Sequence, residues 1–573
     1  MATYPSLKSL LAVFCLFALA PALLAQSNTS PNEVPAVTRT ILLQNAQVVQ
    51  APGQVLDRTS VLIRDGLIEA VGADLAVPFD ARVIAADSFR VYAGFIDGLS
   101  HTGVPKPKPG ETPDIDDPGN PPPDAAGIQP QRDVRTMMDL SEKSIEALRN
   151  AGFTTAHVVP HGNLFPGQGA IVNLAGSNVG QMVLAGEASM FSQFEAARRM
   201  YPATDLGMMA LWRNLYRQAD RRQQRADRFS DRPGGLNRPE YDAVRYAFFP
   251  VVSGEQPVAF KTESYLDAKR ALRLQEELGF QLLLMELKEG WWLTEELADT
   301  PVFLSLDLPD APREATPDSA MADSAMAASE AMDVRVMSHA DTDAEMKALE
   351  AKRDSVRMQY VRQAATLHEA GVTFGFSTLE AKPNDLRKAL QRIVEAGLPE
   401  DEALAALTTD AVQMLGLDAA LGTVEPGKIA NLVVTEGSYF TGGEIRYVFV
   451  DGHPFEMEVK KAAAVASADS AGVSAAGEWS YEIDSPQGVV VGTITLDTDL
   501  AGTMTNNLTG ETSSVSDALV SGNMLTFTAP VTVSGQTMTL EIALEIDGND
   551  AEGSATMSQF GSFPMEAVRS PGL

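Results

Sequence analysis

Short apolar strands alternate with amphipathic helices through the middle of the chain, and this alternation constrains the fold more than any other feature. Strand and helix patterns follow one another, for example at 140–151, 154–159, 266–278, 282–285 and 302–308. Strands separated by helices of this length lie parallel in one sheet, and this many units close the sheet into a barrel. The sequence therefore predicts an α/β fold with a TIM-type (β/α)8 barrel over residues 91–422.

Strand-rich segments flank the predicted barrel. Residues 38–90 contain β-rich runs separated by turn signals, and residues 423–458 return to strands, so we expect both flanks to form one composite β-sandwich. Residues 461–476 are small and polar and predict a linker. Residues 477–573 then alternate strand and turn signals and predict a small all-β sandwich or barrel domain. Within the barrel, the acidic segment 312–342 predicts a flexible insertion.

The first 25 residues are typical of a signal peptide. Lys8 precedes an apolar run over 10–24 that is too short for a membrane-spanning helix, and a polar stretch follows it. The single cysteine, Cys15, lies in this segment, so the mature chain would have no disulfide and no thiolate metal ligand. We therefore predict an exported protein, periplasmic or extracellular, without a membrane span.

The charge balance is strongly acidic. The chain has 44 Lys and Arg residues against 76 Asp and Glu residues, a formal net charge of -32. General nucleic-acid binding requires basic surface that neutralises phosphates, so this class is excluded. Apolar residues make up 45% of the chain, which is typical of a globular protein.

Three motifs resemble the amidohydrolase superfamily, in particular the imidazolonepropionase and dihydroorotase type. AGFIDGLSH at Ala93–His101 is similar to the PGFIDxHxH of the family's first barrel strand. Ala151–Leu174 resembles the second strand and the Gly-rich loop after it, while Leu421–Val434 and then Val448–Gly452 resemble the segment that closes the barrel. Over residues 38–458 the resemblance implies a TIM barrel beside a small sandwich, and hydrolysis of carbon–nitrogen bonds other than peptide bonds.

The resemblance also implies a metal site at the C-terminal mouth of the barrel, where His and Asp side chains hold divalent ions that activate water. Most of those positions differ in this chain. Leu99 replaces the first His of the HxH pair, so His101 is the one family ligand that remains. Lys261 and Glu263 stand where a later His pair is expected, and Leu287 stands at a further ligand position.

The last expected ligand is an Asp near the end of the barrel, where this chain has Ser377 or Thr378. A catalytic zinc usually takes three protein ligands and water. We therefore expect a degenerate metal centre and no cofactor. Zinc would bind only at a relocated site built on His101, His157 and His161, aided by an acidic residue.

Lys261 and Glu263 lie two residues apart on one strand, so their side chains point to the same side of the sheet. They would form a structural ion pair or act in a metal-free mechanism. The candidate catalytic residues are Asp97, Lys261, Glu263 and Glu286, and the candidate pocket residues are His157, His161, Gln168, Ser377 and Thr378.

Two functions remain open from the sequence. In the first, the protein is a hydrolase that uses the relocated site or the metal-free pair. In the second, it is a non-catalytic pseudoenzyme that binds a small molecule, forms an oligomer or pairs with an active relative.

Overall fold

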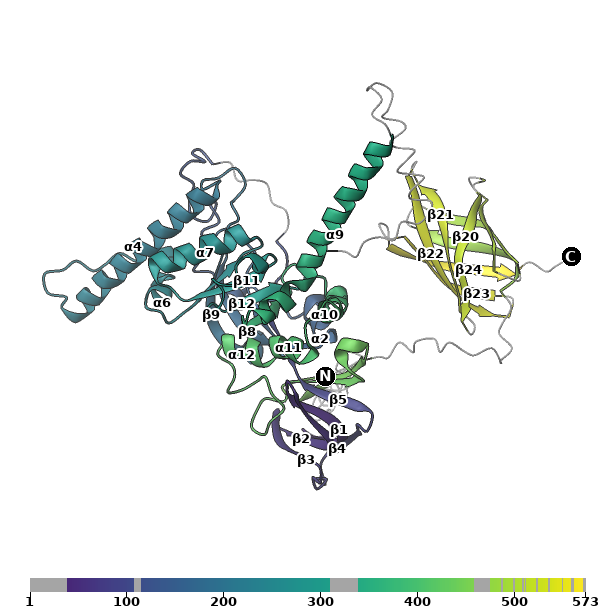
Figure 1. Ribbon diagram of the computed structural model, residues 1–573, viewed down its shortest axis with the longest axis horizontal. Helices are drawn as coiled ribbons and strands as arrows, with labels where there is room; N and C mark the ends of the chain where they lie inside the picture. Colours follow the sequence, from purple (N-terminus) through teal and green to yellow (C-terminus); the bar gives the residue numbers. More distant parts are fainter. Residues whose placement is uncertain are drawn as a thin grey trace, which may run out of the picture. The chain divides into compact units, whose positions relative to one another are not determined.

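The computed structural model describes residues 39–107, 115–309 and 339–457, and residues 475–569 with short gaps. The chain divides into two compact units, Met1–Glu458 and Val459–Leu573 (Figure 1). The predicted signal peptide and most of the predicted insertion and linker lie outside the described residues.

Strands from both sides of the barrel meet in one eight-stranded sheet of the first unit, in the order β16-β15-β14-β5-β1-β2-β3, with β4 also paired to β1. Its strands are β1 (Thr40–Ala51), β2 (Gln54–Arg64), β3 (Leu67–Gly72), β4 (Arg82–Ala85), β5 (Phe89–Ala93), β14 (Leu432–Glu436), β15 (Glu444–Val450) and β16 (His453–Glu456). The junction is the antiparallel pair of β5 and β14, where Ala93 faces Leu432. Chain from before and after the barrel therefore shares one core.

The barrel follows as a second eight-stranded sheet, from β6 to β13 in sequence order. Its strands are β6 (Phe95–Ser100), β7 (Phe153–Val158), β8 (Gly167–Asn173), β9 (Val183–Gln193), β10 (Val258–Lys261), β11 (Leu282–Leu287), β12 (Val302–Ser305) and β13 (Phe374–Ser377). The first and last strands meet where Thr378 N donates to Leu99 O at 3.2 Å. The predicted TIM-type barrel is confirmed.

One strand departs from the regular alternation. β8 runs antiparallel to both β7 and β9, and His157 on β7 faces Ile171 on β8. The cause is the connection after β7, where residues 159–166 return the chain directly without a crossover helix. A parallel neighbour needs a long crossover, whereas an antiparallel one needs only a short loop.

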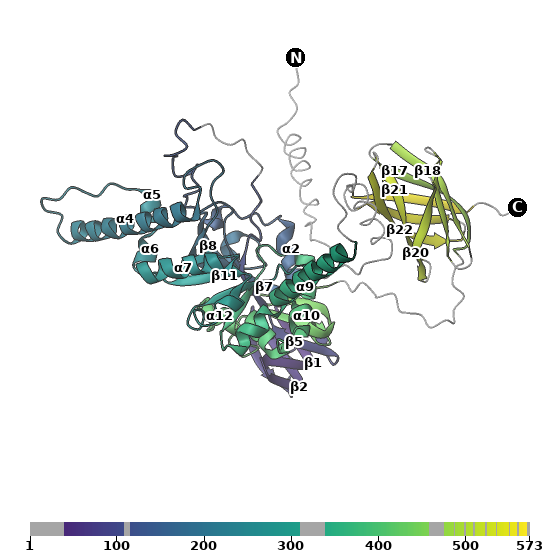
Figure 2. The same cartoon turned by 45° about the horizontal axis from the view of Figure 1, so that its top comes forward.

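Helices surround the barrel (Figures 1 and 2). They are α2 (Lys143–Asn150), α3 (Val179–Met182), α4 (Asp205–Asp231), α5 (Ala243–Tyr246), α6 (Phe249–Val252), α7 (Tyr265–Leu278), α9 (His339–Glu369), α10 (Leu386–Glu395), α11 (Glu400–Leu407) and α12 (Thr409–Met414). Short 3-10 turns are η1 (Val134–Thr136), η2 (Gly290–Trp292), η3 (Pro383–Asp385) and η4 (Tyr439–Thr441). The chain signals these boundaries: Ser264 caps the start of α7, and Gly279 ends it in a left-handed conformation. Among the described residues, no helix has both the length and the apolar character to cross a membrane.

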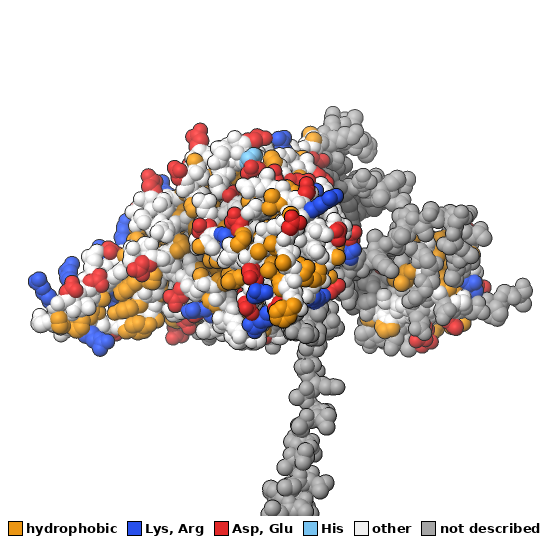
Figure 3. Space-filling model, turned by 90° about the horizontal axis from the view of Figure 1, so that it is seen from below, with side chains coloured by type: hydrophobic (Ala, Val, Ile, Leu, Met, Phe, Trp, Pro, Cys, Tyr) orange, Lys and Arg blue, Asp and Glu red, His pale blue; other side chains and the backbone are white. Residues whose placement is uncertain are grey.

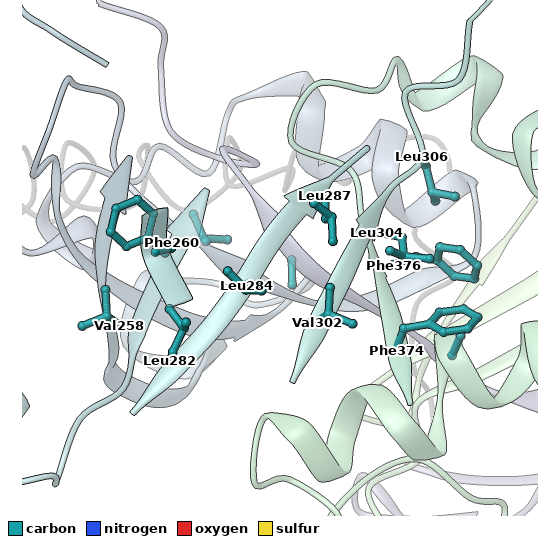
Figure 4. Packing of buried hydrophobic residues seen from close by; sticks show 14 of the residues in the cluster. Val258, Phe260, Leu282, Leu284, Leu287, Val302, Leu304, Leu306, Phe374 and Phe376 are labelled. Carbon is teal, nitrogen blue, oxygen red and sulfur yellow. The ribbon is translucent and has the colours of Figure 1, made fainter. Parts of the chain in front are cut away.

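The barrel strands place alternate residues on opposite faces. The outer face packs apolar side chains beneath the helices, including Val258, Phe260, Leu282 and Leu284 (Figure 4). The intervening residues, such as Ala259, Leu283 and Phe303, form a separate cluster inside the barrel. Lys261 follows Ala259 by two positions, so it lies on the inner face at the end of β10.

The second unit is a closed antiparallel barrel of eight strands, with β24 paired to β17. Its strands are β17 (Gly477–Ser485), β18 (Gly488–Leu496), β19 (Gly502–Asn506), β20 (Thr512–Ser521), β21 (Met524–Val533), β22 (Gln536–Asp547), β23 (Asp550–Met557) and β24 (Gly561–Arg569). Its core contains Trp479, Phe527 and Leu544. This agrees with the predicted all-β region.

Acidic side chains are spread over the face of the molecule shown in Figure 3 and are interspersed with Lys and Arg. The large negative charge of the chain is therefore not gathered in one patch on this face.

Candidate functional site

The C-terminal ends of the barrel strands carry two fully buried carboxyl groups, and the first is Asp97 on β6. Its Oδ1 accepts hydrogen bonds from Leu99 N at 3.2 Å and Thr378 N at 3.0 Å, and its Oδ2 accepts one from Thr378 Oγ1 at 2.7 Å. Burial raises the pKa of Asp97 to about 7, although these donors stabilise the charged form. The carboxyl therefore titrates near neutral pH.

The second buried carboxyl is Glu286 on β11. It lies in a register shift between Leu284 and Leu287 and has a left-handed φ of 60°, which is uncommon for a residue other than glycine. Its Oε1 accepts from Ser305 Oγ at 2.6 Å, and its Oε2 accepts from Ser377 Oγ. Burial raises its pKa to about 7, against the opposing effect of these two hydroxyls.

A lysine lies between carboxylates at the end of β10. Lys261 Nζ is 2.9 Å from Glu263 Oε1 and 2.6 Å from Glu380 Oε1, and its side chain is 12% exposed. Burial lowers the pKa of Lys261, but the bonds to the two glutamates outweigh burial and raise the pKa overall. A third glutamate, Glu195, lies near this group. Burial raises its pKa overall, although the positive charge of Lys261 lowers it.

His157 is buried between neighbouring strands, and both of its ring nitrogens are occupied. Its Nδ1 lies 3.0 Å from Gly98 O and its Nε2 lies 2.8 Å from Ser189 Oγ. A carbonyl only accepts, so we assign the proton to Nδ1 and the donor role in the second bond to Ser189. Burial lowers the pKa of His157 to about 4, so the ring is neutral at physiological pH.

His101 and His161 stack on one another at the mouth, with ring centroids 3.7 Å apart. His101 Nδ1 lies 2.8 Å from Val159 O, and His161 Nε2 lies 3.3 Å from Val104 O. Burial, with a smaller contribution from the neighbouring His161, lowers the pKa of His101 to about 3. His101 Nε2 and His161 Nδ1 have no hydrogen-bond partner in the part of the chain that the structure describes.

The structure brings most of the predicted site residues together in pairs, namely Lys261 with Glu263, Glu286 with Ser377, Asp97 with Thr378, and His101 with His161. Gln168 lies apart from them. Its Nε2 donates to Pro130 O at 2.6 Å, and its Oε1 accepts from Gln256 Nε2 at 2.6 Å. It pairs across the sheet with Met190, which belongs to the outer apolar cluster, so Gln168 also faces away from the interior.

Sequence reasoning missed Ser305 and Glu380, which bond Glu286 and Lys261. Ser305 follows Phe303 by two positions on β12, so both side chains point into the barrel. This alternation would have identified Ser305. Glu380 lies in the loop after β13, where no periodic pattern indicates a direction.

Comparison with known proteins supports the resemblance to amidohydrolases. Residues 359–455 match the sequence model of the amidohydrolase family. This match covers the end of the first unit, so over that segment the chain is similar to the amidohydrolase family. No curated protein matches the sequence. Among solved structures, the chain is similar to an amidohydrolase from Thermotoga maritima MSB8, with a TM-score of 0.57 and 20% identity over 73% of this chain and 100% of that chain.

A further similar structure is an adenosine deaminase from Xanthomonas campestris with bound zinc. Its TM-score is 0.39, with 14% identity over 74% of this chain and 95% of that chain. At this level of identity, the Thermotoga structure supports the fold of the amidohydrolase barrel and nothing finer.

The metal implied by the amidohydrolase family can be tested against these side chains. No group of three or more His, Cys, Asp or Glu side chains with metal-site spacing occurs among the described residues. Lys261 brings an ammonium to an expected ligand position, and Ser377 brings a hydroxyl that is bonded to Glu286. His157 uses both nitrogens. The described residues therefore do not fit a zinc centre with three protein ligands.

Proposed function

We propose that this protein is an exported amidohydrolase-superfamily member with a degenerate metal centre, and that its barrel mouth binds a small molecule without hydrolysing it through a metal-activated water. One observation carries the proposal: polar residues at the expected ligand positions are already bonded to neighbouring side chains. Lys261 is held by Glu263 and Glu380, and Ser377 donates to Glu286.

The ammonium of Lys261 supplies positive charge where the family places a cation. A divalent ion at the same place would be repelled by Lys261 and would need Glu263 and Glu380 to exchange partners. The ion pairs are thus a self-contained alternative to metal binding. Export is supported by the N-terminal pattern of Lys8, an apolar run and small residues.

The test is the metal content of the mature full chain, purified without an affinity tag after growth with added zinc. We expect less than about 0.1 equivalent of any transition metal, because too few ligands converge. About one equivalent that is lost on His101→Ala would overturn the proposal and favour the relocated site. A His453→Ala variant is the matched control, since His453 is exposed and far along the sequence.

A second candidate function is metal-free acid–base catalysis. Asp97 and Glu286 favour it, because burial raises the pKa of both carboxyls to about 7, near the pH at which general acids and bases act best. Turnover of amides or lactams by metal-free protein, lost in Glu286→Gln, would establish this function in place of the first.

A further inference from the structure

The barrel mouth contains an arginine, Arg132, that has no carboxylate partner in the described part of the chain. Arg132 lies just before η1, and its backbone O accepts from Gln168 N at 2.7 Å, which fixes it against the start of β8. Burial lowers the pKa of its half-buried guanidinium, and no carboxylate among the described residues lies within ion-pair distance of it. In a chain with a net charge of -32, a half-buried arginine left unpaired needs an explanation.

The contacts of Arg132 leave one edge of the guanidinium open. Its Nη1 donates to Gln129 Oε1 at 2.8 Å and to His161 O at 3.2 Å, so both hydrogens of that nitrogen are used. Its Nη2 donates one hydrogen to Met137 Sδ at 3.3 Å, a weak acceptor. Nε and the second hydrogen of Nη2 have no acceptor in the described chain. That edge is one of the two that bind an oxyanion with parallel hydrogen bonds.

The described groups that shift the pKa of the two stacked imidazoles beside Arg132 are cationic or neutral. Burial lowers the pKa of His161, and the positive charges of Lys106 and Arg132 lower it further. Besides burial and His161, Lys261 and Lys106 lower the pKa of His101. No carboxylate is among the groups that shift either imidazole. Lys261 is already held by two glutamates, whereas Lys106 is exposed and has no ion pair with a described residue.

We propose that Arg132, together with Lys106 and the stacked pair His101–His161, binds the oxyanion group of the small molecule at the barrel mouth. The inference rests on the proposed function, that the mouth binds a ligand, and names the chemistry of that ligand. A carboxylate and a phosphate both present oxygen pairs that match the open edge of Arg132. The stacked imidazoles would lie near the bound group, because Arg132 Nη1 donates to His161 O at 3.2 Å.

The experiment is calorimetric titration of the mature full chain with two probes, inorganic phosphate and acetate. We expect saturable binding of at least one probe, and binding of only one assigns the oxyanion as phosphate or carboxylate. Arg132→Gln should weaken binding at least about tenfold. Arg132→Lys should weaken it less, because lysine keeps the positive charge but loses the paired N–H donors of the guanidinium. The matched control is Arg135→Gln, because Arg135 lies on the same turn but is paired with Asp133 and Glu187.

A second readout is the imidazole resonances in NMR spectra of the full chain with labelled histidine, recorded at one pH as the probe is added. The bound probe should shift the resonances of His161 in the wild type and in Arg135→Gln, and leave them unchanged in Arg132→Gln. Absence of binding by both probes, or equal binding by Arg132→Gln and the wild type, would overturn the inference. Neither result contradicts the absence of a bound metal, which the proposed function requires and which the metal content tests separately. The circular dichroism of Arg132→Lys shows whether the fold is intact.

Discussion

Ser377 and Thr378 are consecutive in the chain, but their hydroxyl groups bond two different buried carboxyls. Ser377 donates to Glu286 on β11, and Thr378 donates to Asp97 on β6. The end of β13 therefore connects two carboxyls that lie far apart in the sequence. A backbone shift at Ser377 and Thr378 would therefore alter the hydrogen bonds of both Glu286 and Asp97.

Replacement of Thr378 by valine should destabilise the protein by about 1–3 kcal/mol, because it removes a hydrogen bond to a fully buried carboxyl while keeping the shape. The pKa of Asp97 should rise above about 7, since the lost donor stabilised the charged form. Urea unfolding of the mature protein measures the first effect. Thr378→Ser is the control, as it retains the hydroxyl; equal losses in both variants would contradict this role of the hydrogen bond.

The two buried carboxyls also predict a pH dependence. Burial raises their pKa to about 7 from ordinary values of 3.8 and 4.5. Between about pH 4 and 7 the native state holds protons that the unfolded chain has released, so this contribution to stability falls as the pH rises. His101 and His157 titrate in the opposite sense, because burial lowers their pKa. A comparison of variants is needed to separate the two effects.

Glu286→Gln removes one of the raised carboxyls. Its free energy of unfolding relative to the wild type should rise with pH, by up to about 1.4 kcal/mol per unit between about pH 4.5 and 7. Denaturant titrations at several pH values measure the difference. An exposed glutamate, Glu255, supplies the control variant Glu255→Gln, for which we expect a flat difference. A flat difference for Glu286→Gln as well would show that this carboxyl is ionised in the native state.

Lys261→Met should leave Glu263 and Glu380 facing one another without a cation. These glutamate side chains are 54% and 42% exposed, so solvent screens their repulsion, and we expect a loss of only about 1 kcal/mol. The loss should shrink in high salt. Lys269→Met is the control, since its pair with Glu296 spans 3.4 Å between exposed side chains. A gain in stability for Lys261→Met would argue against a structural role for the ion pair.

The fold could be predicted because its signals are local and repeated. Alternating strand and helix patterns identify the barrel, and the motif Ala93–His101 places its first strand. The antiparallel β8 was not predicted, because alternating apolar residues show which face of a strand is buried but not its direction.

Most of the predicted site residues lie on barrel strands or within a few residues of their C-terminal ends. Alternation along β10 and β13 fixes the inward direction of Lys261 and Ser377. It does not fix that of Asp97, because β6 has register shifts on both sides of this residue. Glu380 and Arg132 lie outside the barrel strands, where side-chain direction depends on tertiary packing that the sequence does not display. The register shift between Leu284 and Leu287 places Glu286 within hydrogen-bond distance of Ser305 and Ser377. It likewise depends on the pairing of neighbouring strands, which the sequence does not display.

His157 provides the clearest separation between a structural and a metal-binding role. His157→Ala should destabilise the protein by about 2–4 kcal/mol, because it opens a cavity and leaves Gly98 O and Ser189 Oγ without a partner. It should not change the zinc content of the protein. His453→Ala, at an exposed position, should change neither quantity by a measurable amount. If His157→Ala instead released a bound metal while the free energy of unfolding stayed at the wild-type value, His157 would be a ligand, and the hydrogen bonds to Gly98 and Ser189 would have to break when the metal binds.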